Sequence, residues 1–164
     1  MCDRKAGLPQ PARIIDITEE GADVKRLVLD AEVVAEPGQF VMTWLPGVNE
    51  KPFSLAGATP LTLIIARVGP FTQQVHALRP GDTLWWRGPY GQGFHIPPHQ
   101  PDDGELLLVG GGYGVAPLLM LAERSTQAGW PVRVAVGART RSALFLGGRL
   151  SALGCALASC TEDG

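Results

Sequence analysis

The chain reads Leu-Leu-Leu-Val over residues 106–109 and Gly-Gly-Gly-Tyr-Gly-Val-Ala-Pro over residues 110–117. A short continuous apolar run of the first kind is typical of a strand buried on both faces of a parallel sheet. Apolar residues then recur at helical spacing from Val115 to Ala122, which places the glycines in a strand-to-helix turn. Backbone N–H groups point outward from such a turn, and no Cβ blocks the approach of a phosphate. This segment therefore predicts a phosphate-binding turn in a parallel α/β sheet.

The residues that follow continue the alternation of helix and strand. Pro117 suits the first turn of the helix, and Gly129 suits the position just beyond its end. We expect a strand over 131–136, a helix from Ser142 to Leu153 that Gly154 closes, and a strand over 155–160. This β-α-β-α-β order is the start of a Rossmann-like parallel sheet. Because the sequence stops at Gly164 with one sheet edge open, we expect a partial domain.

The first 94 residues have a different character, with short apolar stretches separated by turn residues. We expect strands over 12–18, 24–30, 39–45, 51–56, 61–68 and 82–87, and one helix over 71–78. Six short strands at spacings of about ten residues predict a small antiparallel barrel. Residues 95–104 contain three prolines and end in Asp-Asp-Gly, so they form the predicted linker.

Composition and charge exclude several classes of function. The net charge of −2 provides no basic field for nucleic acid or anionic lipid. No apolar run approaches the roughly 18 residues that span a bilayer, and residues 1–7 lack the apolar core of a secretory signal. Three cysteines make no disulfide framework. We expect a soluble, cytoplasmic protein with no nucleic-acid or membrane partner.

A second segment of interest is Lys-Pro-Phe-Ser at residues 51–54. It is weak by itself, because a strand entry explains the same residues. A cofactor-binding role for residues 51–54 is supported by Arg67 and by the turns at 69–72 and 88–94. These turns combine glycine, an aromatic ring and a hydrogen-bonding group at strand ends. A flavin requires an apolar wall, backbone donors and a cation at its pyrophosphate. Together with the glycine turn, these segments predict two nucleotide cofactors that face each other across a domain junction.

The glycine turn meets only part of the dinucleotide fingerprint. Gly110, Gly112 and Val115 fit all but the last position of G-x-G-x-x-G, so a turn needed only for helix–strand packing is the alternative. Arg139 and Arg141 follow the second strand, where an acidic residue would bind a ribose 2′-hydroxyl and an arginine a 2′-phosphate. The choice between NAD and NADP stays open, as does a role for these arginines as ordinary surface residues.

The remaining reactive side chains indicate no other chemistry. The three histidines form no metal set. Cys155 and Cys160 cannot complete an iron–sulfur cluster by themselves, so we expect them to be ordinary buried apolar residues. Trp44, Trp85 and Trp86 are expected in the barrel core. We find no catalytic triad and no carboxylate pair, so we assign no catalytic side chain and no metal ligand. That pattern suits redox chemistry, in which cofactors carry the reaction.

Five segments stand in the order and spacing of one known family: residues 37–42, 46–54, 87–94, 108–118 and 137–140. The chain resembles the electron transfer subunit of NAD-dependent dihydroorotate dehydrogenase, in the ferredoxin–NADP reductase superfamily. The resemblance implies a Greek-key FAD-binding barrel over residues 1–99 and a partial NAD-binding α/β domain over residues 100–164.

The resemblance also implies a set of binding residues. The family's flavin motif, arginine-x-aromatic-serine, falls on residues 51–54, and Lys51 replaces the usual arginine. The charge survives but the bidentate fork does not, so pyrophosphate binding is expected to be weaker. The cofactor-binding residues are therefore expected to be Lys51, Pro52, Phe53, Ser54, Ile65, Ala66, Arg67, Phe71, Thr72, Gly88, Gly110, Gly111, Gly112, Gly114, Ala116, Pro117 and Arg139.

The reaction implied by the resemblance is an electron relay in pyrimidine biosynthesis. An FMN-containing catalytic subunit, the expected partner in a hetero-oligomer, would pass electrons through a [2Fe–2S] cluster to FAD and then to NAD. Family members continue past an acidic-Gly sequence like residues 162–164 and carry four cluster cysteines, which this sequence lacks. We therefore expect a C-terminally truncated chain without the cluster and with little NADH oxidation. Gly147 and Gly148 also interrupt a helix that the family keeps continuous.

Three alternatives remain at this point. The chain could serve as the FAD/NAD(P) reductase subunit of a hydrogenase, a sulfur reductase or another oxidoreductase. It could be a non-catalytic flavin-binding module that lost its NAD half. It could also be a fragment that binds no cofactor.

Overall fold

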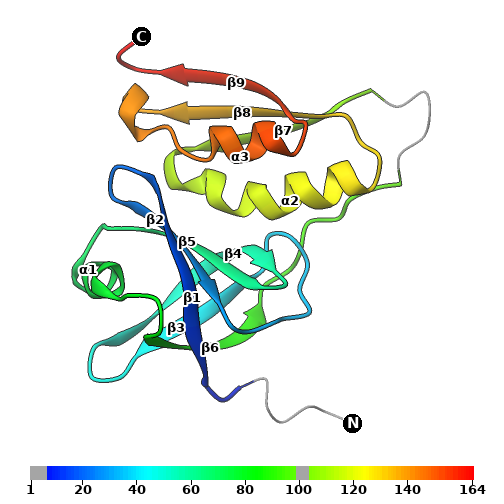
Figure 1. Ribbon diagram of the computed structural model, residues 1–164. Coiled ribbons are helices and arrows are strands. Elements are labelled where there is room, and N and C mark those ends of the chain that lie inside the picture. The colour runs from blue at the N-terminus through cyan, green and yellow to red at the C-terminus, as the bar shows by residue number, and fades with distance from the viewer. Residues whose placement is uncertain (1–6, 99–103) are drawn as a thin grey trace.

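The computed structural model describes residues 7–98 and 104–164. Six strands of the first half close into an antiparallel barrel in the order β1-β2-β5-β4-β3-β6 (Figure 1). Their bounds are β1 Gln10–Gly21, β2 Val24–Leu29, β3 Phe40–Leu45, β4 Asn49–Ala58, β5 Leu61–Ala66 and β6 Thr83–Tyr90. The helix α1 Pro70–Ala77 connects β5 to β6. The predicted barrel and its single helix are confirmed.

Alternation of buried and exposed residues explains why these strands close on themselves. On β3, Val41, Thr43 and Leu45 are buried and their neighbours are half-buried, as expected for a strand with one face in the core. Phe71 and Val75 of α1 join the same core. The prediction that all three tryptophans lie in the core is wrong. Only Trp86 is buried, because successive strand residues face opposite sides, and Trp85 instead packs edge-to-face on Trp44 at 5.7 Å.

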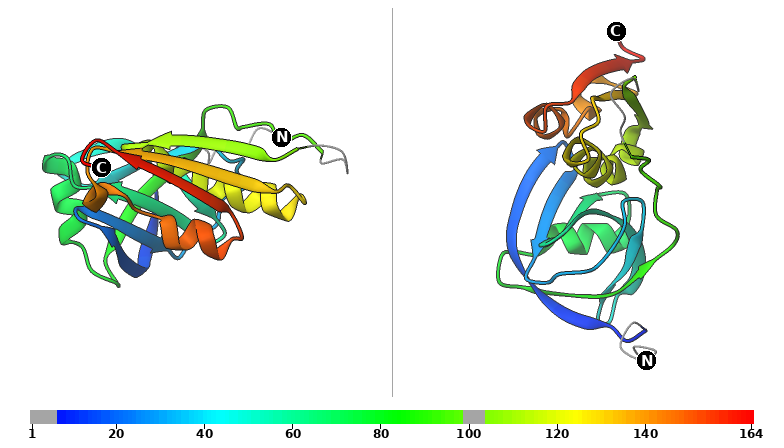
Figure 2. Two further views of the ribbon diagram at one scale, coloured as in Figure 1. Left: turned by 90° about the horizontal axis from the view of Figure 1, so that it is seen from above. Right: turned by 90° about the vertical axis from the view of Figure 1, so that its right-hand side faces the viewer.

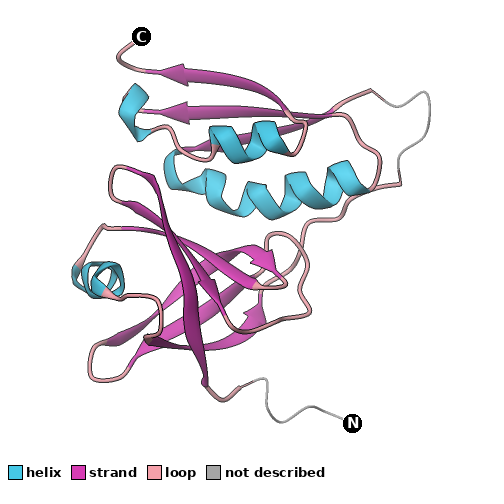
Figure 3. Ribbon diagram, viewed as in Figure 1, coloured by secondary structure: helices cyan, strands magenta, loops and turns pink. Residues whose placement is uncertain are grey.

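The second half forms a three-stranded parallel sheet in the order β7-β8-β9. Its elements are β7 Leu106–Gly111, the 3₁₀ turn η1 Gly112–Val115, α2 Ala116–Gln127, β8 Val132–Ala138, the 3₁₀ turn η2 Arg141–Ala143, α3 Gly147–Ala152 and β9 Ala156–Thr161 (Figure 3). The predicted β-α-β-α-β order is confirmed. Gly129 and Gly154 follow the two helices with positive φ, as their predicted positions require.

The helices α2 and α3 lie between the parallel sheet and the barrel (Figures 1 and 2). A shared apolar cluster joins the two units, and it includes Val24, Ala56 and Ile64 from the barrel. Met120 of α2 reaches into the barrel core itself. The barrel and the α/β unit are therefore packed directly against each other, and this contact fixes the position of the glycine turn relative to the barrel. Within the described residues, no helix is long and apolar enough to cross a bilayer.

Two predictions about the sheet are wrong. The strand β7 is not buried on both faces, because Leu107 and Val109 are 55% and 70% exposed on the face away from α2. Cys160 is exposed, whereas Cys155 is buried as predicted. Burial raises the pKa of the Cys155 thiol. The sequence showed apolar character in both strands but not that only one face of this sheet packs against helices.

The predicted helix from Ser142 to Leu153 is also wrong, because α3 begins only at Gly147. Leu146 adopts the left-handed conformation, with φ of 64°, and it ends the irregular segment before the helix. Phe145 and Leu146 are buried there, so tertiary packing replaces the helical turn. Parts of the predicted linker (99–103), together with Cys2 and His99, lie outside the described residues, as does the predicted domain boundary after residue 99.

Candidate functional site

A cavity of about 250 Å³ opens where the barrel meets the glycine turn of the sheet. One wall comes from β4, β5 and the start of α1, and the other comes from η1 and the start of α2. The lining residues are Pro52, Phe53, Ser54, Ile64, Ala66, Val68, Thr72, Tyr113, Ala116 and Pro117. The two sequence segments that were singled out, residues 51–54 and 110–117, thus contribute to one site.

The β4 wall offers two polar side chains, Ser54 and Lys51, that have no partner in the described part of the chain. The Ser54 hydroxyl lines the cavity, and it forms no hydrogen bond with any described residue. The ammonium group of Lys51 is exposed and, within residues 7–98 and 104–164, pairs with no carboxylate. The Phe53 ring stacks on Phe71 with centroids 6.1 Å apart and planes 22° apart, so it presents a fixed aromatic surface.

The start of α1 is a rigid corner of the same wall. The Thr72 hydroxyl oxygen accepts hydrogen bonds from the N–H groups of Val68 and Gly69 at 2.9 and 3.0 Å, and the hydroxyl donates to the Gly69 carbonyl at 3.0 Å. Pro70 occupies the first helical position. Thr72 therefore holds the loop at the helix start. First-turn N–H groups remain there for an anion.

Other predicted flavin residues lie outside the cavity. Ile65 is fully buried in the barrel core, and Phe71 is buried beneath Phe53. The Arg67 guanidinium pairs with the Asp23 carboxylate, and its Nε lies 2.9 Å from Oδ1. Gly88 lies on β6, where its φ of 137° and the nearby Tyr90 ring exclude a side chain. The predicted contacts of these four residues with a flavin remain predictions.

The glycines of the turn divide into one packing residue and three open positions. A Cβ at Gly110 would lie 2.8 Å from a Leu118 methyl carbon and 3.2 Å from the Val115 Cα, so this glycine permits close helix–strand packing. A Cβ at Gly111, Gly112 or Gly114 would meet nothing within 4 Å. The packing explanation thus accounts for Gly110 alone. Gly112 has a φ of 51°, a conformation that glycine adopts readily, and around Gly111 and Gly114 the absence of a side chain leaves open space beside the backbone.

The loop at the carboxyl end of β8 places Arg139 and Arg141 at the same edge of the sheet as the glycine turn. Gly111, Gly137 and Cys160 stand side by side in register. Arg139 and Arg141 follow β8 with exposed side chains. The Arg141 N–H donates to Asp163 at 3.1 Å, and the Glu162 N–H donates to the Arg139 carbonyl at 3.2 Å. Ligands of open parallel sheets bind at this edge.

Charge near the β4 wall is largely balanced within the protein. Glu50 and Arg87 form a two-pronged pair, at 2.6 Å and 2.7 Å, and Arg87 also donates to the Tyr90 hydroxyl at 3.1 Å. The Arg87 guanidinium holds the pKa of the Glu50 carboxyl below its usual range, and this pairing raises the pKa of Arg87. Lys51, the next residue on β4, lies on the opposite face, and no carboxylate of residues 7–98 or 104–164 pairs with it.

Three lining residues were not in the predicted set: Ile64, Val68 and Tyr113. Tyr113 belongs to the glycine turn, and its ring lies 6.3 Å from that of Phe145. Its position inside a glycine cluster was the available signal. Ile64 and Val68 carried no signal beyond ordinary strand character. Among the described residues, no group of three or more His, Cys, Asp or Glu side chains converges on a metal position.

Known proteins resemble this chain in both sequence and fold. A protein of Methanocaldococcus jannaschii is 39% identical over 156 residues, and one of Methanothermobacter thermautotrophicus is 41% identical over 163 residues. Both are named probable dihydroorotate dehydrogenase B (NAD(+)), electron transfer subunit. The matches cover 95% and 96% of this chain but only 58% and 59% of those proteins. No family model matches the chain.

Solved structures with the same fold include an NADH-dependent reduced ferredoxin–NADP oxidoreductase, with a TM-score of 0.81 and 26% identity. That match covers 96% of this chain and 59% of the other. A ferredoxin–NADP⁺ reductase of Plasmodium falciparum has a TM-score of 0.80 at 11% identity over 97% of this chain and 72% of its own, which speaks for the fold alone. In sequence the chain is similar to the electron transfer subunits of dihydroorotate dehydrogenase B, of whose length it spans 58–59%, and in fold it is similar to the ferredoxin–NADP reductases.

Proposed function

We propose that this chain is the FAD-binding part of an electron transfer subunit that links a catalytic dihydroorotate dehydrogenase subunit to NAD. The observation that carries the proposal is the shared cavity, in which the flavin motif of β4 faces the glycine turn of the parallel sheet. The names of the relatives support the same assignment. The partner is the FMN-containing catalytic subunit, in a hetero-oligomer of the pyrimidine pathway.

The barrel wall fits the isoalloxazine and pyrophosphate of FAD. Phe53 supplies an aromatic surface, and the Ser54 hydroxyl, which bonds to no described residue, can donate a hydrogen bond to a ring nitrogen or oxygen. Lys51 and the start of α1 supply positive charge for the pyrophosphate. When bound, FAD supplies the exchange between two-electron and one-electron transfer. The residues named here hold the ring and keep one of its faces against the protein.

The opposite wall fits a pyridine nucleotide. Gly111, Gly112 and Gly114 leave room for its phosphates, and Tyr113 lines the cavity between this turn and the flavin wall. Arg139 extends the same edge toward the adenosine end. The described cysteines do not fit an iron–sulfur cluster, since Cys155 is buried and Cys160 is exposed. No step is therefore assigned to a cluster on these residues.

The proposal is tested by two measurements on the same preparation. The purified chain should take up added FAD and show a bound-flavin visible spectrum. A colourless protein that does not bind added FAD would contradict the assignment. The second measurement is co-purification with a barrel-type dihydroorotate dehydrogenase expressed together with the chain. If the chain binds FAD but co-purifies with a hydrogenase or a sulfur reductase and not with dihydroorotate dehydrogenase, the chain is the reductase subunit of that other enzyme.

A further inference from the structure

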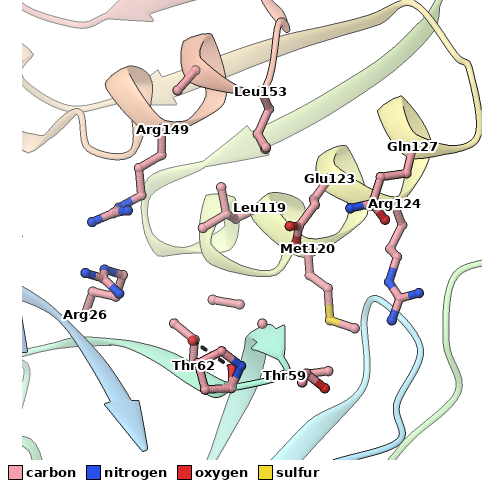
Figure 4. Close-up of a pocket in the computed structure, with 15 residues that line it drawn as sticks. Arg26, Thr59, Thr62, Leu119, Met120, Glu123, Arg124, Gln127, Arg149 and Leu153 are labelled. Atoms are coloured by element: carbon pink, nitrogen blue, oxygen red, sulfur yellow. Dashed lines mark hydrogen bonds between the residues drawn. The ribbon is translucent and has the colours of Figure 1, made fainter. Parts of the chain in front are cut away.

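A second cavity, of about 490 Å³, lies between the barrel and the helical layer and shares no lining residue with the first. Its walls come from β2, from the β4–β5 hairpin, and from α2 and α3 (Figure 4). This volume falls within the range of about 300–1,000 Å³ that is typical of small-molecule sites. The electron relay proposed above gives this cavity no role.

Three arginines line the second cavity: Arg26 on β2, Arg124 on α2 and Arg149 on α3. Arg26 and Arg149 share one carboxylate, because Glu20 accepts from their Nε atoms at 3.1 and 2.5 Å. The Glu20 side chain is only 8% exposed, and Arg26 is also held by Asp16 at 2.8 Å. Figure 4 shows Arg26 and Arg149 turned toward each other at one end of the cavity and Arg124 at the other. Side chains fixed in this way cost little conformational entropy when a ligand binds.

The arginines retain unused donors. A guanidinium carries five N–H donors, and Arg149 uses only its Nε–H, so four donors (five minus one) meet no acceptor in the described part of the chain. No described carboxylate pairs with Arg124. A planar, preorganised guanidinium of this kind suits a carboxylate or sulfonate group, which can accept two parallel hydrogen bonds.

The rest of the cavity limits the ligand further. Leu119, Met120 and Leu153 form an apolar surface between the charged ends. The formal charges nearby cancel, since three arginines stand against the carboxylates of Glu20, Asp16 and Glu123. A polyanion such as a nucleoside diphosphate would leave negative charge uncompensated beside the apolar surface. A single anionic group adds only one negative charge, which the unused N–H donors of Arg149 can stabilise by hydrogen bonds, and an apolar body can cover Leu119, Met120 and Leu153.

We propose that the second cavity binds a monoanionic organic molecule whose anionic group is held by Arg149 and whose apolar body lies on Met120. The site takes walls from both units of the molecule, so an occupant stabilises their contact by mass action. It is separate from the cavity that faces the cofactors.

Anilinonaphthalene sulfonate, a monoanion with an aromatic body, is a suitable probe for this site. Calorimetric titration of the full chain, with and without added FAD, should show one saturable site with the same affinity in both conditions. Arg149→Met should weaken binding about tenfold, and Arg149→Lys, which keeps a charge beside Glu20, should weaken it less. Arg124→Gln, on the exposed side of α2, should weaken it several-fold. Inorganic pyrophosphate should not compete for this site.

Two control variants make the result decisive. Arg133→Gln removes the same charge from β8, where Arg133 pairs with Glu105 away from the cavity, and should leave probe binding unchanged. Ala152→Trp places a bulky ring at the cavity wall and should abolish binding whether or not the charges matter. Equal affinity in the native chain and Arg149→Met, or in the native chain and Ala152→Trp, would overturn the proposal. Loss of binding on FAD addition would instead place the probe in the flavin cavity and also overturn it.

Discussion

At the scale of single residues, the cations near the first cavity divide into those with a partner and those without. Arg67 and Arg87 are paired with Asp23 and Glu50, whereas Lys51 pairs with no described carboxylate. A cation that is already paired with a carboxylate offers a phosphate less net charge and fewer hydrogen-bond donors. The unpaired side chain is therefore the better candidate for a pyrophosphate contact.

Lys51→Ala should lower FAD affinity at least about tenfold, because a charge-assisted hydrogen bond contributes roughly 1.5–3 kcal/mol. Flavin fluorescence titration measures the change. Lys51→Arg serves as the matched control, since it keeps the charge and restores the fork that the family uses, and it should bind FAD at least as well as the native chain. Unchanged affinity in Lys51→Ala, with a loss in Arg67→Ala, would move the pyrophosphate to Arg67.

Glu50 gives the stability of the barrel a pH dependence of known sign. Arg87 lowers the pKa of Glu50 in the folded state, so the unfolded chain binds a proton more readily. The stabilisation is present above the ordinary glutamate pKa of about 4.3 and is lost as pH falls through the lowered value. The effect is small because the pair is partly exposed. Thermal midpoints of native and Glu50→Gln protein should differ at neutral pH and converge in acid, and a constant difference would contradict this.

At the scale of single elements, two adjacent glycines at the end of β7 give opposite expectations. Gly110→Ala should destabilise the fold by about 1–3 kcal/mol, because its Cβ would crowd Leu118 and the Val115 backbone. Gly111→Ala meets open space and should leave stability nearly unchanged. Its effect should appear in the affinity for a pyridine nucleotide. Denaturant unfolding and nucleotide titration of the pair separate packing from binding, and equal destabilisation would contradict the division.

The elements that could be predicted from sequence are those whose local pattern and tertiary packing agree. The barrel strands and α2 follow from alternation, helical spacing and the glycine at 129, and their positions match. The helix predicted over 142–153 is wrong because two glycines weaken a helix locally. Buried Phe145 and Leu146 then fix an irregular path for the chain before α3. Exposure of Val109 depends on which face α2 covers, and a run of apolar letters does not carry that information.

The site was predictable to a similar degree. Residues 51–54 and 110–117 carry compositional signals, so the meeting of Ser54 with Pro117 around one cavity could be expected. The burial of Ile65 and the Arg67–Asp23 pairing could not, because both depend on partners far away in the sequence. The arginine cluster of the second cavity gave no signal at all. Arg26, Arg124 and Arg149 come from three elements, and only the packing of the two units brings them together.

At the scale of the whole molecule, Glu20 holds the barrel and the helical layer together. Its carboxylate joins Arg26 of β2 to Arg149 of α3. Glu20→Ala removes the carboxylate that both guanidinium groups share, and it should lower the free energy of unfolding by about 1–3 kcal/mol. Asp16→Ala removes a half-exposed partner of Arg26 and should cost less than about 1 kcal/mol. Denaturant unfolding measures both, and similar costs would show that the shared carboxylate does not connect the units.

The exposed side chains of Leu107 and Val109, on the face of the parallel sheet away from the helices, have a colloidal consequence. A net charge of −2 provides only weak mutual repulsion between copies, and added salt screens it further. Attraction between these faces should therefore make the osmotic second virial coefficient of the chain fall as ionic strength rises. Val109→Lys should raise that coefficient in static light scattering without changing the thermal midpoint. In a crowded solution, the same face would promote association between molecules wherever nothing covers it.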